Sequence, residues 1–480
     1  MFNKLGPVWL VARRELRDQF RDWRVILPMV ILVFCFPILM NEFSKEAVRF
    51  LNQYNTNFIL ERLVPFSILI IGFFPITVSL VVALESFVGE KERGTIEPLL
   101  CAPLDNWQLY FGKLLVGVVT PLAASYLSIA LYLVLATQQE NLTLPPLEVT
   151  LQLLVLTAAH AFLMVSAAIV ISVQSTSVKA ANLLASFIVI PVAVLMQGET
   201  VILVWGDRVV LWLAVAGVTI LALLLIRMGI AHFEREYLLG REIDVVNLKW
   251  VWDAFWKNFL GGARSIGEWY RFVFNGSLRR ILPAILVIVL VAGASVWLGY
   301  EWVMENVSPL VANASAEDFT KIEERVLKVS DLPNGQFSAP FLFFNNTRAV
   351  TAIFIMGLIS FSVLGILLYM INIGMVSGVF TFLLLLSERV PSVRPLDIFL
   401  AGVLPHGIFE IPALMISSAA MLYFGVVMVT PQTGKSMGEV IIELLADWFK
   451  IFIGIVIPLL ALAALIEAYI TPQLLVSVLK

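Results

Sequence analysis

Charged residues are scarce in this chain of 480 residues, where Asp, Glu, Lys and Arg together make up 14% of the sequence. Hydrophobic residues account for 60% of the sequence, and the mean hydropathy is +0.92. So much apolar side chain cannot be packed into a soluble core, so the composition excludes a soluble globular protein and predicts a membrane protein with many spans. The net charge of −3 gives no indication of nucleic-acid binding.

Cysteine and histidine are also rare, with two and three residues respectively. Cys35 lies in an apolar run and Cys101 in a polar loop, so their positions favour neither a disulfide nor a metal site, and both are expected to be small apolar fillers. The tripeptide GKS at residues 434–436 ends like a phosphate-binding loop, but Val429 stands where that loop needs its first glycine. The sequence therefore predicts no ATPase, no catalytic residue and no metal site in this chain.

Apolar runs of the length that crosses a bilayer, roughly 20 residues, recur along the whole chain. Six precede residue 240 and five follow it, which predicts an all-α polytopic membrane protein with about eleven spans. The run Ile373–Ser387 is short enough to be a re-entrant hairpin instead. The expected spans are Val25–Met40, Pro65–Leu84, Phe111–Ala136, Val149–Val173, Ala180–Gly198, Val209–Ala231, Ile281–Gly299, Arg348–Tyr369, Ile373–Ser387, Leu396–Gly425 and Phe449–Ile470.

The distribution of basic residues predicts the orientation in the membrane. Six basic residues precede the first span, nine lie between Arg227 and Arg280, and none lies between Gln138 and Glu148. Because cytoplasmic loops carry an excess of Lys and Arg, we expect the N-terminus, the loop 85–110 and the segment 232–280 to be cytoplasmic. No signal peptide is evident, since the first apolar run begins only after 24 residues.

A dense charged segment, EKERGTIEPLLCAPL at residues 90–104, separates the second and third apolar runs. Gly94 can end one helix, and Thr95 can cap the next by accepting a hydrogen bond from an exposed backbone N–H. Asp105 and Gln108 have the spacing of a capping box before the next apolar run. The spacing alone leaves two interpretations open, a short rigid cytoplasmic helix or an ordinary solvated loop.

Within this segment, charged residues are followed by Gly-Thr, a glutamate, paired leucines and a proline, at Glu90, Glu92, Arg93, Gly94, Thr95, Glu97, Leu99, Leu100 and Pro103. With Gly112 and Lys113, this pattern resembles the motif that follows the second span in ABC-2-type transporter permeases. In that family the segment is a coupling helix that docks into a cytoplasmic ATPase. The resemblance implies a six-helix permease domain over residues 1–240 and an ATPase-coupling role for these residues.

The segment 12–24 predicts an amphipathic helix that lies in the membrane interface. Trp9, Leu16, Phe20 and Trp23 fall in one narrow helical stripe, and the Arg and Asp residues face elsewhere. A plain lipid anchor and a functional role are both open on these grounds. The ABC-2 resemblance implies an elbow helix that lies on the cytoplasmic leaflet and also borders the ATPase.

Residues 241–279 differ in composition from both flanking parts, because tryptophans and basic residues alternate there. Trp250, Trp252, Trp256 and Trp269 are interleaved with Lys and Arg, a combination that suits the lipid headgroup layer. We expect a cytoplasmic, surface-lying linker between two membrane units, with the boundary near residue 245.

The C-terminal part, residues 280–480, contains no second copy of the Gly94–Thr95–Glu97 pattern. It instead contains FFNNTRA at 343–349, Asn372, Gly374 with Gly378, PHGIFEIPA at 405–413 and LIEAYITP at 465–472. These strings, in this order, resemble the stage II sporulation protein M family. The resemblance implies a five-helix transmembrane bundle.

Three ionisable residues of this part, His406, Glu410 and Glu467, lie within apolar runs, where such groups are costly unless paired or hydrated. His406 and Glu410 are four residues apart and so share a helix face. We interpret the three as an intramembrane polar cluster, either a hydrogen-bonded staple between helices or a site for an ion, a proton or a headgroup. One histidine with two carboxylates is too few to demand a metal.

The resemblances together imply the membrane subunit of an ATP-driven exporter in a prokaryotic inner membrane, with its N-terminus cytoplasmic. They imply two copies of a separate ABC ATPase, which bind ATP and Mg²⁺, and pairing of this chain with itself or with another permease. This chain would hold no cofactor, and its remaining partner is membrane lipid. A scaffold, signalling or envelope-remodelling assembly without flux is the main alternative, and an intramembrane hydrolase with Glu410 as base is a minor one.

Overall fold

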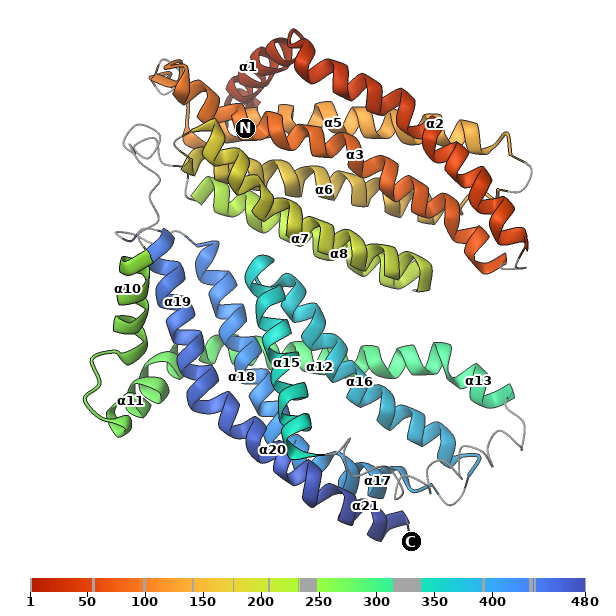
Figure 1. The fold of residues 1–480 in the computed structure, drawn as a ribbon, viewed down its shortest axis with the longest axis vertical. Coiled ribbons are helices and arrows are strands. Elements are labelled where there is room, and N and C mark those ends of the chain that lie inside the picture. The colour runs from red at the N-terminus through yellow and green to blue at the C-terminus, as the bar shows by residue number, and fades with distance from the viewer. Residues whose placement is uncertain are drawn as a thin grey trace. The chain divides into compact units, whose positions relative to one another are not determined.

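The chain is described here by a computed structural model, in which every regular element of the described residues is helical (Figure 1). It divides into two compact units. Unit 1 is Met1–Val246 with Val429–Pro431, and unit 2 is Asn247–Met428 with Gln432–Lys480. The residues that the structure describes are 2–53, 57–97, 101–139, 142–175, 177–205, 208–231, 233, 248–313, 338–390, 393–430, 435 and 437–479.

Unit 1 is a bundle of long apolar helices around α3, which packs against α2, α5, α6 and α7. Val64, Ile68 and Ile76 of α3 are fully buried, as expected for a helix that is apolar on all sides. Figure 1 shows α2, α3, α5, α6, α7 and α8 running side by side. The helices of unit 1 are α1 (Phe2–Gln19), α2 (Trp23–Gln53), α3 (Asn57–Glu92), α5 (Asn106–Ala136), α6 (Leu147–Gln174), α7 (Val178–Trp205) and α8 (Arg208–Ala231).

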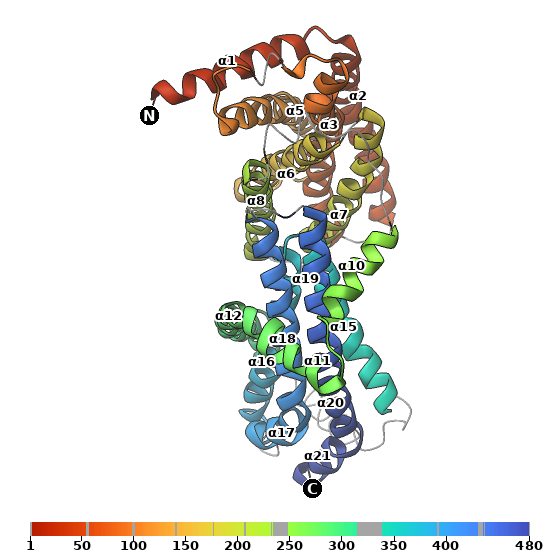
Figure 2. The ribbon, with the colours of Figure 1, turned by 90° about the vertical axis from the view of Figure 1, so that its left-hand side faces the viewer.

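Helix α1 runs across the bundle at the end where α3 finishes and α5 begins, as Figures 1 and 2 show together. Gly112 of α5 permits this crossing. A Cβ atom at Gly112 would lie 2.7 Å from Cγ1 of Val11 and 3.3 Å from the carbonyl oxygen of Val8. The glycine therefore lets the backbones of α1 and α5 approach closely, which places α1 next to the charged residues at this end of the bundle.

Unit 2 is a second helical bundle, with short helices before and after its long ones. The strongest packing joins α12 to α16 and α18 to α20, and α15 packs against both α16 and α20. The elements are α10 (Leu248–Leu260), α11 (Ile266–Phe272), η1 (Val273–Leu278), α12 (Leu282–Asn306), α13 (Ser308–Asn313), α15 (Ala339–Ile359), α16 (Val363–Ser387), α17 (Pro395–Gly402), α18 (Leu404–Met428), α19 (Met437–Ile451), η3 (Phe452–Val456), α20 (Ile457–Tyr469) and α21 (Thr471–Leu479).

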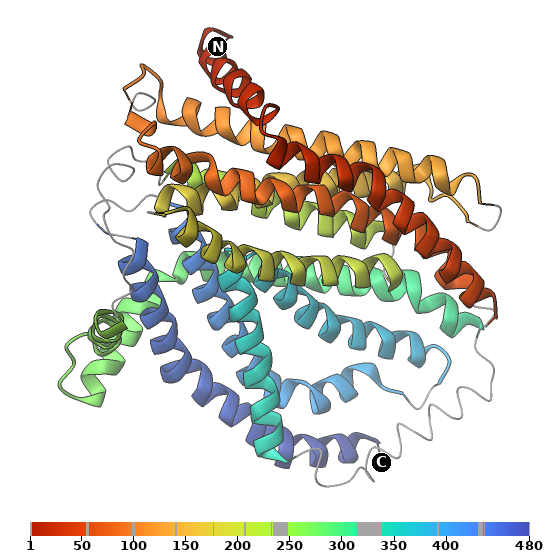
Figure 3. The same ribbon diagram turned by 45° about the horizontal axis from the view of Figure 1, so that its top comes forward.

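An aromatic stack lies in the core of unit 2, around Trp448 of α19. The Trp448 ring stacks on Phe354 at 3.6 Å between centroids and on Phe452 at 4.6 Å. Phe452 begins η3, a π-helical turn that joins α19 to α20, and Figure 3 shows residues 437–469 as one continuous helix in dark blue. The amphipathic stretch before the last expected span is therefore part of the same helix as that span.

Asp447 of α19 fixes the start of α12 by accepting three hydrogen bonds. The donors are Ser277 Oγ at 2.7 Å, Arg280 Nη1 at 2.8 Å and Lys450 Nζ at 2.9 Å. Two cations beside a carboxylate that is only 12% exposed satisfy its charge and its hydrogen-bonding capacity together. The contact joins residues 170 positions apart in the sequence.

Ten helices of the described residues are long and apolar enough to cross a membrane, and they confirm the all-α polytopic fold class. The predicted span Ala180–Gly198 is α7, which has 28 residues but only a shorter apolar stretch, Pro191–Val204. Its crossing therefore stays a prediction. The ten are Val25–Leu51, Leu60–Glu92, Asn106–Ala136, Leu147–Gln174, Val210–Ala231, Leu282–Asn313, Ala339–Ile359, Val363–Ser387, Leu404–Met428 and Gly438–Tyr469.

The expected span Arg348–Tyr369 is wrong, because the chain reverses inside it. Helix α15 ends at Ile359 and α16 begins at Val363. Between them, Phe361 and Ser362 have φ angles of 47° and 79°, the left-handed region that side chains other than glycine rarely adopt. The following expected span, Ile373–Ser387, is the second half of α16, so the re-entrant hairpin is also wrong.

The expected span Leu396–Gly425 is likewise divided, into α17 and α18 with a break at Val403. Pro405 follows two residues later, in the first turn of α18, where a missing N–H costs nothing. Pro412 lies inside α18 and does not end it. Of the prolines in this region, only the one at the helix start marks a boundary.

Most of the described part of the expected linker belongs to unit 2. Helix α10 packs along α19, and Phe255 contacts Phe449 with ring centroids 5.7 Å apart. Trp269 donates from Nε1 to the carbonyl oxygen of Phe259 at 2.9 Å, and its ring lies against Gly454. Residues 248–278 are thus a packed part of unit 2 rather than a free connector, although Trp252 remains 63% exposed.

Candidate functional sites

The predicted helix end at Gly94 is confirmed. Gly94 has a φ of +68°, which glycine adopts without strain. Its N–H donates to the carbonyl oxygen of Lys91 at 3.1 Å, and the N–H of Thr95 donates to that of Glu90 at 2.9 Å. This pair of bonds is a Schellman cap, and it turns the chain sharply out of α3 into the predicted coupling segment.

Several described residues of the coupling segment are exposed. They are Arg93, Thr95, Glu97 and Pro103, and the Glu97 carbonyl oxygen accepts from Cys101 N–H at 3.0 Å. The Thr95 hydroxyl donates to the Glu90 carbonyl oxygen at 3.3 Å, and its predicted role as the cap of the next helix stays a prediction. Pro98, Leu99 and Leu100 lie outside the described residues. Residues 434 and 436, from the tripeptide that ends like a phosphate-binding loop, also lie outside them.

The capping box predicted for Asp105 and Gln108 is present at the start of α5. The Gln108 side-chain oxygen accepts from the backbone N–H of Asp105 at 2.9 Å. Cys101 and Cys35 are both exposed free thiols, so the expectation of an apolar filler is wrong for Cys101, whereas Cys35 lies on the candidate span Val25–Leu51 and its role stays a prediction. The exposed Cys101 offers a natural labelling position in the coupling segment.

Lys113 of α5 joins three helices at this end of unit 1. Its ammonium lies 3.1 Å from a carboxylate oxygen of Glu15 in α1 and 3.0 Å from one of Glu90 in α3. It also donates to the carbonyl oxygen of Ser86 at 2.7 Å and lies 4.9 Å from the ring centroid of Phe87. The lysine side chain is 1% exposed. A buried cation between two carboxylates therefore ties the start of the coupling segment to α1.

Glu92 links the same segment to α7. Its carboxylate accepts from the backbone N–H of Val178, the first residue of α7, at 2.8 Å. The first N–H groups of a helix have no intrahelical acceptor and carry the positive end of the helix dipole, so a carboxylate there is stabilising. Through Lys113 and Glu92, the end of α3 is bound to α1, α5 and α7, and a force on the segment would reach all three helices.

We expect Glu92→Ala to lower the free energy of unfolding of the chain by about 1 kcal/mol, because it removes the acceptor for the exposed N–H groups of α7. Glu92→Gln, which keeps an acceptor oxygen but loses the charge, should fall between Glu92→Ala and wild type. Urea unfolding of the purified chain in detergent, followed by tryptophan fluorescence, measures the free energy of unfolding of both variants.

Glu46→Ala is the control, since Glu46 forms an exposed pair with Arg49 and should change the free energy of unfolding by less than about 0.5 kcal/mol. Equal effects at Glu92 and Glu46 would contradict the capping role.

The predicted interfacial stripe faces away from the rest of unit 1 but does not lie on one helix. Trp9, Phe20 and Trp23 are 64%, 59% and 68% exposed, and Leu16 is half-buried. Helix α1 ends at Gln19 and Trp23 begins α2, so the expectation of a continuous helix over residues 12–24 is wrong. Exposed tryptophans at the end of a helix that crosses the bundle suit a membrane interface.

A buried ionisable pair inside unit 1 was not predicted from the sequence. His160 of α6 and Glu199 of α7 lie 3.3 Å apart, between Nε2 and Oε1, and each side chain is 3% exposed. The Phe73 ring meets the imidazole edge to face, with 6.0 Å between centroids. Ionisable residues within spans carry a functional hypothesis by default. That rule could have selected His160, whereas Glu199 directly follows the expected span Ala180–Gly198 and is not selected by it.

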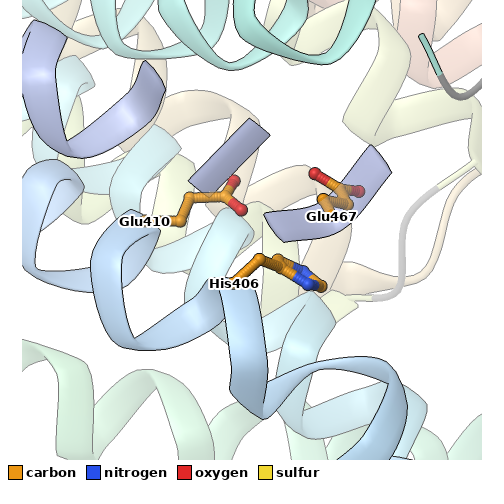
Figure 4. A group of neighbouring side chains, drawn as sticks. All are labelled: His406, Glu410 and Glu467. Atoms are coloured by element: carbon orange, nitrogen blue, oxygen red, sulfur yellow. The ribbon is translucent and has the colours of Figure 1, made fainter. Parts of the chain in front are cut away.

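The three residues of the predicted polar cluster meet in unit 2, as Figure 4 shows. His406 and Glu410 lie one turn apart on α18, and Glu467 lies on α20, which packs against α18. Each offers one potential ligand atom, and these atoms all lie within 4.8 Å of one another. The i, i+4 spacing predicted the first pair and the apolar run around Glu467 predicted the third residue, and the structure brings Glu467 to the pair from a different helix.

Thr471 joins the cluster from the start of α21. Its hydroxyl lies 3.3 Å from Nδ1 of His406, and the residue is 7% exposed. The place of Thr471 in the string LIEAYITP does not predict this contact, because the threonine is 65 residues from His406. It matters because a partner on one ring nitrogen determines which nitrogen of the imidazole is available to a ligand.

Comparison with known proteins agrees with this division of the chain. Residues 9–205 match the family described as ABC-2 family transporter protein, and residues 284–472 match the family described as Stage II sporulation protein M. An uncharacterized protein of Methanocaldococcus jannaschii, MJ0793, is 31% identical over 166 residues, which cover 33% of this chain and 85% of that protein.

The ABC-2 family is a membrane component of transport systems that generally work with a cytoplasmic ABC ATPase. The coupling segment, the Lys113 ion pairs and the α1 crossing all fall within residues matched by this family or beside them, and the His406 cluster falls within the second match. The chain is therefore a multi-pass membrane protein in which a region that matches the ABC-2 transporter family, residues 9–205, is followed by a region that matches the stage II sporulation protein M family, residues 284–472.

Proposed function

We propose that this chain is the membrane subunit of an ATP-driven exporter, with the N-terminal domain as its permease half. Two copies of a separate cytoplasmic ATPase bind ATP and Mg²⁺ and dock on the coupling segment. The chain pairs with a second copy or with another permease, because one permease half provides only one side of a pathway. The complex lies in a prokaryotic inner membrane with its N-terminus in the cytoplasm.

The single observation that carries this proposal is the fixation of the coupling segment to the transmembrane helices. Glu90 and Glu92 bind α5, α1 and α7 through Lys113 and Val178. Beyond them, Arg93 and Glu97 are exposed and available to a partner. A segment held at its base and exposed at its tip has the form that transmits a docked partner's movement, whereas an ordinary solvated loop does not need such fixation.

Cross-linking from the natural Cys101 tests the docking. In a Cys35→Ala background, a thiol-to-amine cross-linker at Cys101 should capture a nucleotide-binding chain from cells that express the complex. Cys101 should also be protected from membrane-impermeant thiol reagents in intact cells. Capture only of extracytoplasmic proteins, or labelling of intact cells, would contradict both the orientation and the docking.

We expect Glu97→Lys to reduce this capture and ATP-dependent transport about tenfold or more, because reversing a charge in a docked interface costs more than about 1.4 kcal/mol. Glu46→Lys, another exposed glutamate of unit 1 outside the segment, is the matched control and should leave both unchanged. An unaltered cross-link and unaltered transport in Glu97→Lys would remove Glu97 from the coupling role.

The fusion to a stage II sporulation protein M domain favours one alternative, an assembly in which ATP hydrolysis drives a signal or an envelope-remodelling partner without flux. Vesicles that contain the complex and enclose both ATP and a total cell extract distinguish export from an assembly without flux. Export predicts extract components whose distribution across the membrane changes with ATP, measured by mass spectrometry. ATP turnover without any such change would support the alternative.

A further inference from the structure

We propose that His406, Glu410 and Glu467 bind a divalent transition-metal ion, of the class of Zn²⁺ or Mn²⁺, within unit 2. The site would be held by α18 and α20, with Thr471 orienting the histidine. It is independent of the proposed export function, because no residue of the coupling segment or of unit 1 takes part.

The geometry brings three different donors to one point. One imidazole nitrogen and two carboxylate oxygens lie within 4.8 Å of one another, and Figure 4 shows the side chains converging from the two helices. Donors that bind zinc tetrahedrally at about 2.0–2.2 Å are roughly 3.3–3.6 Å apart. Rotation of the flexible glutamate side chains, by roughly 1.5 Å at the carboxylate oxygens, would bring the three donors to that spacing.

Thr471 gives the histidine the orientation that a metal ligand needs. Ligating histidines usually donate the N–H of their other ring nitrogen to a neighbouring oxygen, which fixes the tautomer. The 3.3 Å approach of His406 Nδ1 to the Thr471 hydroxyl provides that partner. With the proton on Nδ1, the lone pair of Nε2 is free to bind a metal.

The charges of the cluster also point to a cation. Among the described residues, no donor makes a hydrogen bond to Glu410 or Glu467, and no Lys or Arg forms an ion pair with either carboxylate. Both lie on apolar helices that are candidate spans, where unpaired carboxylates are costly. A divalent ion supplies two positive charges for two carboxylates and satisfies them in one step.

The donor types select the class of metal. Magnesium and calcium prefer shells made entirely of oxygen, whereas imidazole together with carboxylates suits zinc, manganese and iron. Three protein ligands also leave at least one position for water or another ligand. The single histidine, which argued against a metal on sequence alone, is sufficient when two carboxylates and a threonine partner converge on it.

Metal binding by the full chain in lipid nanodiscs tests this site. After removal of metal with a chelator, titration with Zn²⁺ in competition with a chromophoric chelator should show about one ion per chain, with micromolar or tighter affinity. Wild-type protein loaded with Co²⁺ should give an X-ray absorption spectrum of oxygen and imidazole ligands without sulfur. Absence of bound metal at micromolar free Zn²⁺, or a sulfur-containing shell, would overturn the proposal and leave a proton-sharing staple.

Substitutions locate the ion. His406→Gln, Glu410→Gln and Glu467→Gln should each weaken Zn²⁺ binding more than a hundredfold, and Thr471→Val about tenfold. Glu305→Gln, at an exposed carboxylate near the end of α12, is the control and should bind as wild type does. Unchanged affinity in both glutamate variants would overturn the assignment. If a variant fails to fold, the wild-type cobalt spectrum decides the question without it.

Discussion

Replacing Lys113 by methionine should lower the free energy of unfolding by about 3–5 kcal/mol, because it leaves Glu15 and Glu90 facing each other without their cation. Methionine keeps most of the length and volume of the side chain, so loss of packing contributes little. The lysine side chain is 1% exposed and the glutamates are 23% and 17% exposed, so water can replace the lost pairing only in part. Urea unfolding in detergent, monitored by tryptophan fluorescence, measures the change.

In the Lys113→Met variant we expect the coupling of ATP hydrolysis to transport to be lost together with stability. Lys113 joins the end of α3 to α1, so its loss should also uncouple ATP hydrolysis by the partner from transport. Adding Glu90→Gln to Lys113→Met should restore part of the lost stability, since it removes one unpaired carboxylate. Lys45→Met is the control, because Lys45 forms an exposed pair with Glu42 and should cost less than about 1 kcal/mol. A Lys113→Met protein as stable as the Lys45→Met protein would show that the buried pairing does not hold these helices.

Local signals in the sequence were sufficient to predict the ends of helices in the coupling segment. A glycine after a charged run predicts a left-handed helix end, and Gly94 has that conformation. The spacing of Asp105 and Gln108 predicts a capping box, and the box is present. The ion pairs of Lys113 could not be predicted in the same way, because Glu15 lies 98 residues away and its approach depends on how α1 crosses α5.

The predicted helix boundaries in unit 2 were wrong where the chain turns at serines, without a glycine or a proline. Neither glycine nor proline stands at residues 360–362, so the apolar run continues through the turn in the sequence. Tertiary contacts hold the strained backbone instead. The Ser362 hydroxyl donates to the Met421 carbonyl oxygen at 2.7 Å, and Gly425 leaves space for Ser362 beside it. Such a turn becomes visible only when α18 is in place.

The polar groups within the membrane show the same limit. His406 and Glu410 were predicted together because four residues separate them on one helix, and Glu467 because it interrupts an apolar run. His160 interrupts an apolar run as well, and Glu199 directly follows one, but they come from different helices and neither suggested the other. Pairing between helices follows from packing, and a single sequence contains no direct record of it.

Substituting Gly299 by alanine should lower the free energy of unfolding of unit 2 by about 3 kcal/mol. A Cβ atom at Gly299 would overlap the carbonyl oxygen of Gly374, and a backbone atom cannot move aside as a side chain can. Helices α12 and α16 would have to separate, which would also break the 2.7 Å hydrogen bond from Ser377 Oγ to the Val296 carbonyl oxygen. Tryptophan fluorescence of the chain, to which the buried Trp448 of unit 2 contributes, follows the unfolding.

Gly293→Ala is the matched control for Gly299→Ala, because both glycines lie on α12 and no heavy atom lies within 4 Å of a Cβ atom built at Gly293. Alanine is a better helix former than glycine, so Gly293→Ala should leave stability unchanged or raise it by up to about 1 kcal/mol. The opposite signs of the two substitutions separate close packing from helix propensity. If both variants were as stable as wild type, the backbones of α12 and α16 would not be in contact at Gly299 and Gly374. Close backbone packing would then not explain why glycine stands at position 374 of the sporulation-protein pattern.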